Sequence, residues 1–135
     1  MKKFFLLSLF VSMAFSFVNA QEIKSSSTDQ PQDGPKIQFN EQEHNYGTIQ
    51  KGGDGNCEFL FTNEGNEPLI LSNVKASCGC TTPSWTKEPI MPGKTGSIKV
   101  RYNTNNVGNF TKTITVTSNA INSPRITLKI KGKVE

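Results

Sequence analysis

Apolar and polar residues alternate with a period of two along most of the chain after Pro35. This alternation is typical of β-strands that bury one face, and no window of ten residues shows the 3.6-residue repeat of a helix. The longest run is Phe110 to Ser118, in which threonines occupy the alternate positions. The pattern predicts extended segments at residues 37–40, 46–49, 57–62, 69–74, 98–102, 110–118 and 125–134.

Clusters of glycine, proline and asparagine separate these segments, for example at residues 51–55 and 91–94. Seven or eight short strands that recur about every 8–12 residues between such turns are typical of an all-β sandwich. We therefore expect an Ig-like antiparallel β-sandwich. Its core should contain six aromatic side chains, those of Phe39, Phe59, Phe61, Trp85, Tyr102 and Phe110.

The first twenty residues have the pattern of a signal peptide. Lys2 and Lys3 precede an apolar stretch from Phe4 to Val18, and Ala20 ends a small-residue cleavage site. Fifteen apolar residues are short of the roughly 20 that a membrane-spanning helix needs. We expect cleavage after Ala20, no membrane span in the mature protein, and a periplasmic or secreted location.

Residues 21–35 are polar and rich in serine, glutamine and proline, a composition that cannot bury enough apolar surface to order a chain. They are predicted to form a disordered tether, and residues 36–135 a single domain. The net charge of +4 includes Lys2 and Lys3, and residues 1–20 contain no acid, so the mature chain carries +2. No basic patch interleaved with aromatic residues is present, which argues against nucleic acid as a partner.

The motif Ser77-Cys78-Gly79-Cys80-Thr81 carries the most distinctive chemistry of the chain, and the only tryptophan, Trp85, follows it. A disulfide requires Cα atoms about 4.4–6.8 Å apart. An extended i, i+2 pair lies near about 7 Å, at the upper limit. Because glycine adopts φ values closed to other residues, Gly79 is expected to bend the segment and allow a Cys78–Cys80 disulfide.

Two alternatives for the cysteines stay open. A disulfide from Cys57 to Cys78 or Cys80 would close a longer loop and stabilise the fold by about 3.4 kcal/mol, against about 1.6 kcal/mol for the three-residue ring. However, Cys57 shares its parity with Phe59, which predicts that it faces the core. In the second alternative, Cys78 and Cys80 are free thiols. They would either carry out redox chemistry or bind copper or zinc, with Met91 and His44 as further metal ligands.

The chain has one histidine, no Gly-x-Ser-x-Gly motif and no paired carboxylates within apolar runs. These absences favour a protein that is not an enzyme and needs no cofactor. We expect a non-enzymatic exported module that binds a protein or a cell-envelope component. The rival hypothesis is a thiol redox or metal-handling protein that uses Cys78 and Cys80.

Several motifs resemble the bacterial domain-of-unknown-function family 1573, at residues 44–49, 59–63, 68–70 and 77–81 and onward to Val134. The resemblance covers essentially all of residues 37–135. It implies an Ig-like sandwich similar to the Hydin and major-sperm-protein class, and it implies no established activity. Cys57 departs from the family pattern, which speaks against a family-wide site of three cysteines.

Overall fold

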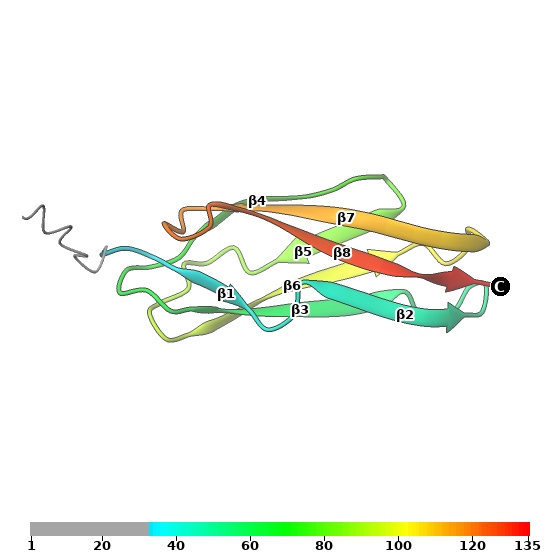
Figure 1. Cartoon of the computed structure of the whole chain (residues 1–135), viewed down its shortest axis with the longest axis horizontal. Coiled ribbons are helices and arrows are strands. Elements are labelled where there is room, and N and C mark those ends of the chain that lie inside the picture. The colour runs from blue at the N-terminus through cyan, green and yellow to red at the C-terminus, as the bar shows by residue number, and fades with distance from the viewer. Residues whose placement is uncertain (1–32) are drawn as a thin grey trace, which may run out of the picture. The chain divides into compact units, whose positions relative to one another are not determined.

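The computed structural model describes residues 33–135, which form two four-stranded sheets packed face to face (Figure 1). The predicted all-β sandwich is confirmed, and no helix occurs in the described part of the chain. The predicted signal peptide and residues 21–32 of the predicted tether lie outside the described residues. The eight strands are β1 Ile37–Phe39, β2 Glu43–Ile49, β3 Asn56–Asn63, β4 Leu71–Ala76, β5 Thr81–Trp85, β6 Thr95–Tyr102, β7 Gly108–Ser118 and β8 Arg125–Val134.

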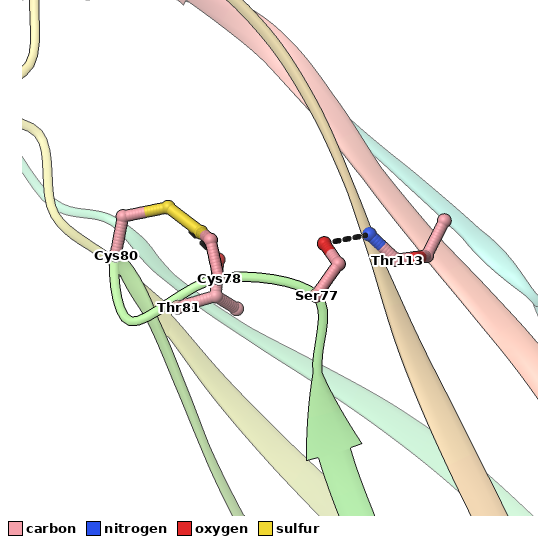
Figure 2. The surroundings of a disulfide bond; sticks show 5 residues. All are labelled: Ser77, Cys78, Cys80, Thr81 and Thr113. Carbon is pink, nitrogen blue, oxygen red and sulfur yellow. Dashed lines mark hydrogen bonds between the residues drawn. A yellow bond between two sulfur atoms is a disulfide. The ribbon is translucent and has the colours of Figure 1, made fainter.

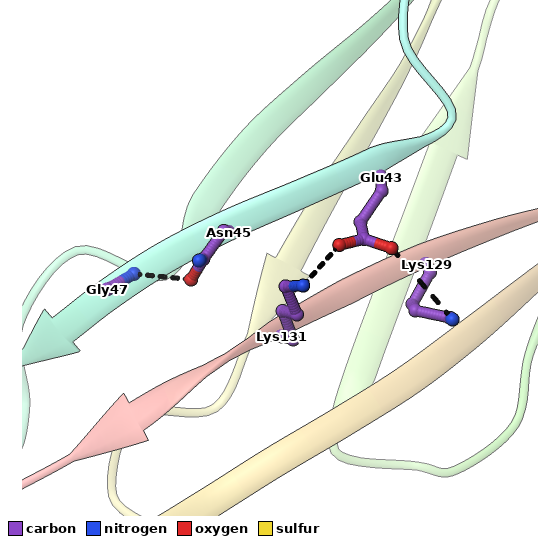
Figure 3. Close-up of polar contacts among 5 residues, drawn as sticks. All are labelled: Glu43, Asn45, Gly47, Lys129 and Lys131. Atoms are coloured by element: carbon purple, nitrogen blue, oxygen red, sulfur yellow. Dashed lines mark hydrogen bonds and ion pairs between the residues drawn. The ribbon is translucent and has the colours of Figure 1, made fainter.

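One sheet has the order β1-β3-β6-β5 and the other β2-β8-β7-β4. Neighbouring strands are antiparallel except β2 and β8, which pair in parallel at one edge of the second sheet. The reason is that β1 and β2 are successive segments of one chain run, which crosses from one sheet to the other. At the parallel edge the Glu43 carboxylate lies 2.5 Å from Lys131 Nζ and 3.9 Å from Lys129 Nζ (Figure 3).

The core lies between the sheets and follows the period-two pattern closely. On β8, Leu128 and Ile130 are buried while Lys129 is exposed, as predicted. Tyr102 and Phe110, from opposite sheets, stack with their ring centroids 3.8 Å apart. Five of the six expected core aromatics are buried, and Trp85 is the exception.

Trp85 is only half-buried because β5 is an edge strand of its sheet. Its ring packs against the core on one side. The Nζ atom of Lys87 lies 4.9 Å from the ring centroid. Part of the indole is thus accessible from the side of the sandwich.

The folded body begins earlier than predicted. Gly34 and Pro35, assigned to the tether, are buried against two loops. The N–H of Gly34 donates to Asn66 Oδ1 at 2.7 Å, and the carbonyl of Pro35 accepts the N–H of Ile121 at 2.9 Å. Their composition suggested a tether because glycine and proline interrupt regular structure. In the folded domain, however, their backbone groups form hydrogen bonds with residues that are distant in the sequence.

Candidate functional site

The Cys-Gly-Cys motif forms the tight connection between β4 and β5 (Figure 2). Cys78 and Cys80 are half-buried, their Cα atoms are 5.3 Å apart, and their sulfur atoms are joined. The Ser77 hydroxyl accepts the N–H of Thr113 at 3.2 Å, and the Cys80 carbonyl accepts the N–H of Asn103 at 2.8 Å. The loop is therefore bound to β7 and to the β6–β7 loop, and the state of the two sulfurs in the cell stays a prediction.

Gly79 does not have the role that the sequence suggested. Its φ is not positive, so the ring closes in a conformation that other residues adopt, and the expected use of glycine-only φ values is wrong. A Cβ atom built at Gly79 would meet no atom within 4 Å. Neither the backbone nor the packing requires a glycine at this position.

Cys57 is half-buried and free, and it packs against the core on the same face as Phe59, in agreement with its predicted parity. Burial raises the pKa of its thiol. Burial and the contact with Cys57 likewise raise the pKa of Tyr46, whose hydroxyl donates to the Gly55 carbonyl at 2.7 Å. A thiol that is kept protonated in this way is a weak nucleophile.

The structure does not bring the alternative metal ligands together. Met91 lies in the loop next to Asn63, at the opposite end of β3 from the Cys78–Cys80 loop. His44 lies on β2, where its ring contacts Tyr46 edge to face with the centroids 4.5 Å apart. Within residues 33–135, no group of three or more His, Cys, Asp or Glu side chains could hold a metal ion.

A pocket of about 490 Å³ lies beside the Cys78–Cys80 loop. Its lining comes from the β2–β3 loop, the cysteine loop and the β6–β7 loop, at the end of the sandwich that carries the C-terminus (Figure 1). The lining residues are 52–56, 79–80, 82 and 101–105. Sequence reasoning missed this pocket, since residues 51–55 and 103–108 gave only a turn signal.

Three polar side chains form a row along one wall of the pocket. Asn56 on β3, Arg101 on β6 and Thr82 on β5 are in register and exposed on the outer face of the sheet. At the pocket's end Asp54 Oδ1 accepts hydrogen bonds from the N–H and Nδ2 of Asn56, at 2.9 and 2.8 Å. Asn103 Oδ1 accepts the N–H of Asn105 at 3.0 Å. These bonds hold the side chains of Asp54, Asn56 and Asn103 in the absence of a ligand.

A second hollow, of about 250 Å³, follows the same two strands away from the pocket. It is lined by Ser84, Trp85, Thr86, Glu88, Ser97 and Lys99. On β6, Lys99 precedes Arg101 by two residues and emerges on the same face. The two hollows thus lie one after the other along the outer face of β5 and β6.

Comparison with protein families adds the decisive observation. The model of a family described as a protein of unknown function, DUF1573, matches residues 37–134. The chain belongs to this family. The DUF1573 match confirms the resemblance seen in the sequence and covers every strand of the sandwich.

Solved structures similar to this DUF1573 domain share its fold at low sequence identity. A protein of unknown function from Porphyromonas gingivalis W83 has a TM-score of 0.66 at 16% identity, over 75% of this chain and 47% of that chain. The PapD-like domain 7 of human CEP192 has a TM-score of 0.62 at 9% identity, over 78% and 92%. The CsuC–CsuE chaperone–adhesion subunit complex of Acinetobacter baumannii gives a TM-score of 0.56 at 9% identity, over 74% and 57%.

This chain thus spans about half the length of the Porphyromonas gingivalis protein. A comparison with curated proteins finds no match. In residues 33–135 no helix has the length and apolar character needed to cross a membrane.

Proposed function

We propose that this DUF1573 protein is a non-enzymatic, exported binding module, periplasmic or secreted, whose partner is a protein or another component of the cell envelope. The observation that carries the proposal is the preformed polar pocket beside the Cys78–Cys80 loop. Its volume lies within the 300–1,000 Å³ that is ordinary for ligand sites. Loops carried by a rigid sandwich are also the usual place for binding residues.

The chemistry of the lining favours binding over catalysis. The two sulfur atoms beside the pocket are joined to each other, and the free thiol of Cys57 has a raised pKa because it is buried. Asp54 and Arg101 contribute hydrogen-bonding groups without an adjacent nucleophile in the described lining. The fold adds indirect support, since the similar CsuC chaperone is described in a complex with another protein.

Co-sedimentation with envelope fragments tests the proposal. The purified mature chain, residues 21–135, is incubated with isolated envelopes of the source bacterium and centrifuged. Two charge reversals are compared: Arg101→Glu in the pocket and Lys75→Glu on the exposed outer face of the other sheet. The unaltered chain and the Lys75 variant should sediment, whereas the Arg101 variant should lose most of its retention.

Protease treatment of the envelopes beforehand distinguishes a protein partner from another component. If the unaltered chain stays in the supernatant, or if both variants sediment equally, the proposed site is wrong. Export is tested separately, by expressing the full chain and sequencing the N-terminus of the protein in the periplasm and medium. A mature protein that begins at Gln21 is expected, and retention of Met1 in the cytoplasm would contradict the exported location.

A further inference from the structure

The two hollows along β5 and β6 are each lined by one acidic and one basic side chain. The pocket contains Asp54 and Arg101, and the smaller hollow contains Glu88 and Lys99. None of the ion pairs in residues 33–135 involves these four side chains. The site therefore offers charged hydrogen-bonding groups of both signs without a net charge, which suits an uncharged polar ligand better than a polyanion or a polycation.

The exposed polar groups of the lining besides these include the amides of Asn56, Asn103 and Asn105 and the hydroxyl of Thr82. Such a lining places donors and acceptors close together, which matches ligands with adjacent hydroxyl groups. Apolar recesses for large side chains are not part of this lining. Trp85 also lines the neighbouring hollow, although its side chain shares the face of its partner Ile98 and packs against the edge of the core.

Recognition of a peptide by strand addition is disfavoured at this place. The open edge beside the hollows is β5, which contains Pro83. The N–H of Thr86 donates to the carbonyl of Ser97 on β6. Even-numbered residues of β5 therefore direct their backbone N–H and C=O groups toward β6, and the backbone of Pro83 is directed toward the open edge. Proline has no N–H, so the edge lacks a donor that an added strand would need.

Gly79 provides an independent indication that the pocket is kept open. It lines the pocket, has no positive φ, and would accept a Cβ atom without a contact. By contrast, a Cβ at Gly96 would lie 2.5 Å from the ring of Phe61, so that glycine is required by packing. The missing side chain at Gly79 has no such structural cause, and a larger residue there would extend into the space at the pocket.

We infer that the outer face of β5 and β6 binds an uncharged saccharide chain, with the pocket hydrogen-bonding one sugar and the smaller hollow beside Trp85 holding the next. This inference rests on the proposed function and narrows the envelope component to a neutral glycan. Arg101, Asn103 and Asp54 would bond the sugar hydroxyls. Gly79 would leave room for the sugar ring.

The intrinsic fluorescence of Trp85 provides a direct assay, because it is the only tryptophan of the chain. The mature protein is titrated with triacetylchitotriose and with maltotriose up to about 10 mM, a range that detects millimolar affinity. At least one of the two should shift the emission and the amide signals of the pocket. Hexaglutamate and trigalacturonate serve as charged probes. Because the ligand is neutral, saccharide affinity should change less than twofold between about 0.05 and 0.5 M salt.

Three variants locate the site. Arg101→Ala and Gly79→Leu should weaken saccharide binding at least tenfold, whereas Lys75→Ala, outside the site, should leave it within twofold. Circular dichroism and thermal melting of each variant confirm that it is folded. The inference is overturned if neither saccharide binds, if Gly79→Leu binds as well as the unaltered chain, or if a charged probe binds more tightly. If saccharides fail but envelope retention still depends on Arg101, the proposed function stands and only the saccharide is excluded.

Discussion

Asn63 at the end of β3 is fully buried, and each polar atom of its side chain is hydrogen-bonded. Its Nδ2 donates to the carbonyls of Glu67 and Ile90, at 2.7 and 2.9 Å. Its Oδ1 accepts the N–H groups of Lys36 and Gly65, at 3.3 and 2.9 Å. One side chain therefore joins the chain before β1, the β3–β4 connection and the β5–β6 connection.

At about 1 kcal/mol for each hydrogen bond, Asn63→Ala should lower the free energy of unfolding by about 4 kcal/mol. With an ordinary denaturant slope this moves the urea midpoint down by roughly 2–3 M. Asn73→Ala is the matched control, because Asn73 is exposed on β4, and it should cost no more than about 0.5 kcal/mol. A loss below about 1.5 kcal/mol for Asn63→Ala would refute the reasoning, since it would mean that water or neighbouring groups replace the four bonds.

Asn63→Asp checks the donor side of this arrangement. An ionised carboxylate keeps both accepted bonds but turns an oxygen toward the two carbonyls that Asn63 Nδ2 now bonds. Burial and these carbonyls should raise the pKa of the new carboxyl group above its unfolded value. The folded state is then favoured below the unfolded pKa of about 3.9 and loses this contribution as the pH rises through the folded pKa. The Asp variant should therefore approach the stability of the unaltered chain in acid, and a constant deficit between about pH 4 and pH 7 would contradict this explanation.

Three further predictions concern the cysteines and the N-terminus. Replacing Cys78 and Cys80 together by serine should lower the free energy of unfolding in urea by only about 1–2 kcal/mol, because a three-residue loop constrains the unfolded chain weakly. Peptide mapping of the unreduced protein should find both cysteines in one cross-linked fragment. Burial raises the pKa values of Cys57 and Tyr46 in the folded protein. The free energy of unfolding should therefore be unaffected by these groups below pH 9.0, the ordinary pKa of a thiol, and should fall as the pH rises from there toward the folded-state pKa values. The fall should be less steep in a variant that carries both Cys57→Ala and Tyr46→Phe. Deleting residues 21–32 should leave the melting temperature within about 2 °C, as expected of an untied terminus, whereas a larger loss would show that this segment contacts the domain.

The strands could be predicted because the burial of alternate residues is a local property of an extended chain. On β8, for instance, Leu128 and Ile130 face the core and Lys129 and Lys131 face outward, as the sequence indicates. The strand β5 escaped prediction because Pro83 interrupts it and its Thr and Ser residues carry no apolar alternation. The parallel pairing of β2 with β8 also could not be predicted, since the direction of a pairing depends on which distant segment lies alongside.

The candidate site was predictable only in the part that is local. Residues two apart in the chain, such as Cys78 and Cys80, must be neighbours, and their pairing could be proposed from chain geometry alone. The pocket instead combines Asp54 and Arg101, which are 47 positions apart and meet only because β3 pairs with β6. Hydrophobic periodicity places strands in a sandwich but contains no information on which loops meet at its end.

The edges of the sandwich bear on how such a domain can bind a partner. An exposed strand edge has unpaired backbone N–H and C=O groups to which another chain can add a strand. Short strands, bulges and proline at the edge hinder this addition. Here β1 has three residues, β5 contains Pro83, and the pairings of β2 and β4 are irregular at Asn45–Thr48 and Leu71–Asn73. Each of the four edges thus carries one of these devices. The chain shares its fold with chaperone domains, but its edges resist strand addition. The proposed binding therefore agrees better with recognition through the side chains of the pocket than with recognition through backbone pairing.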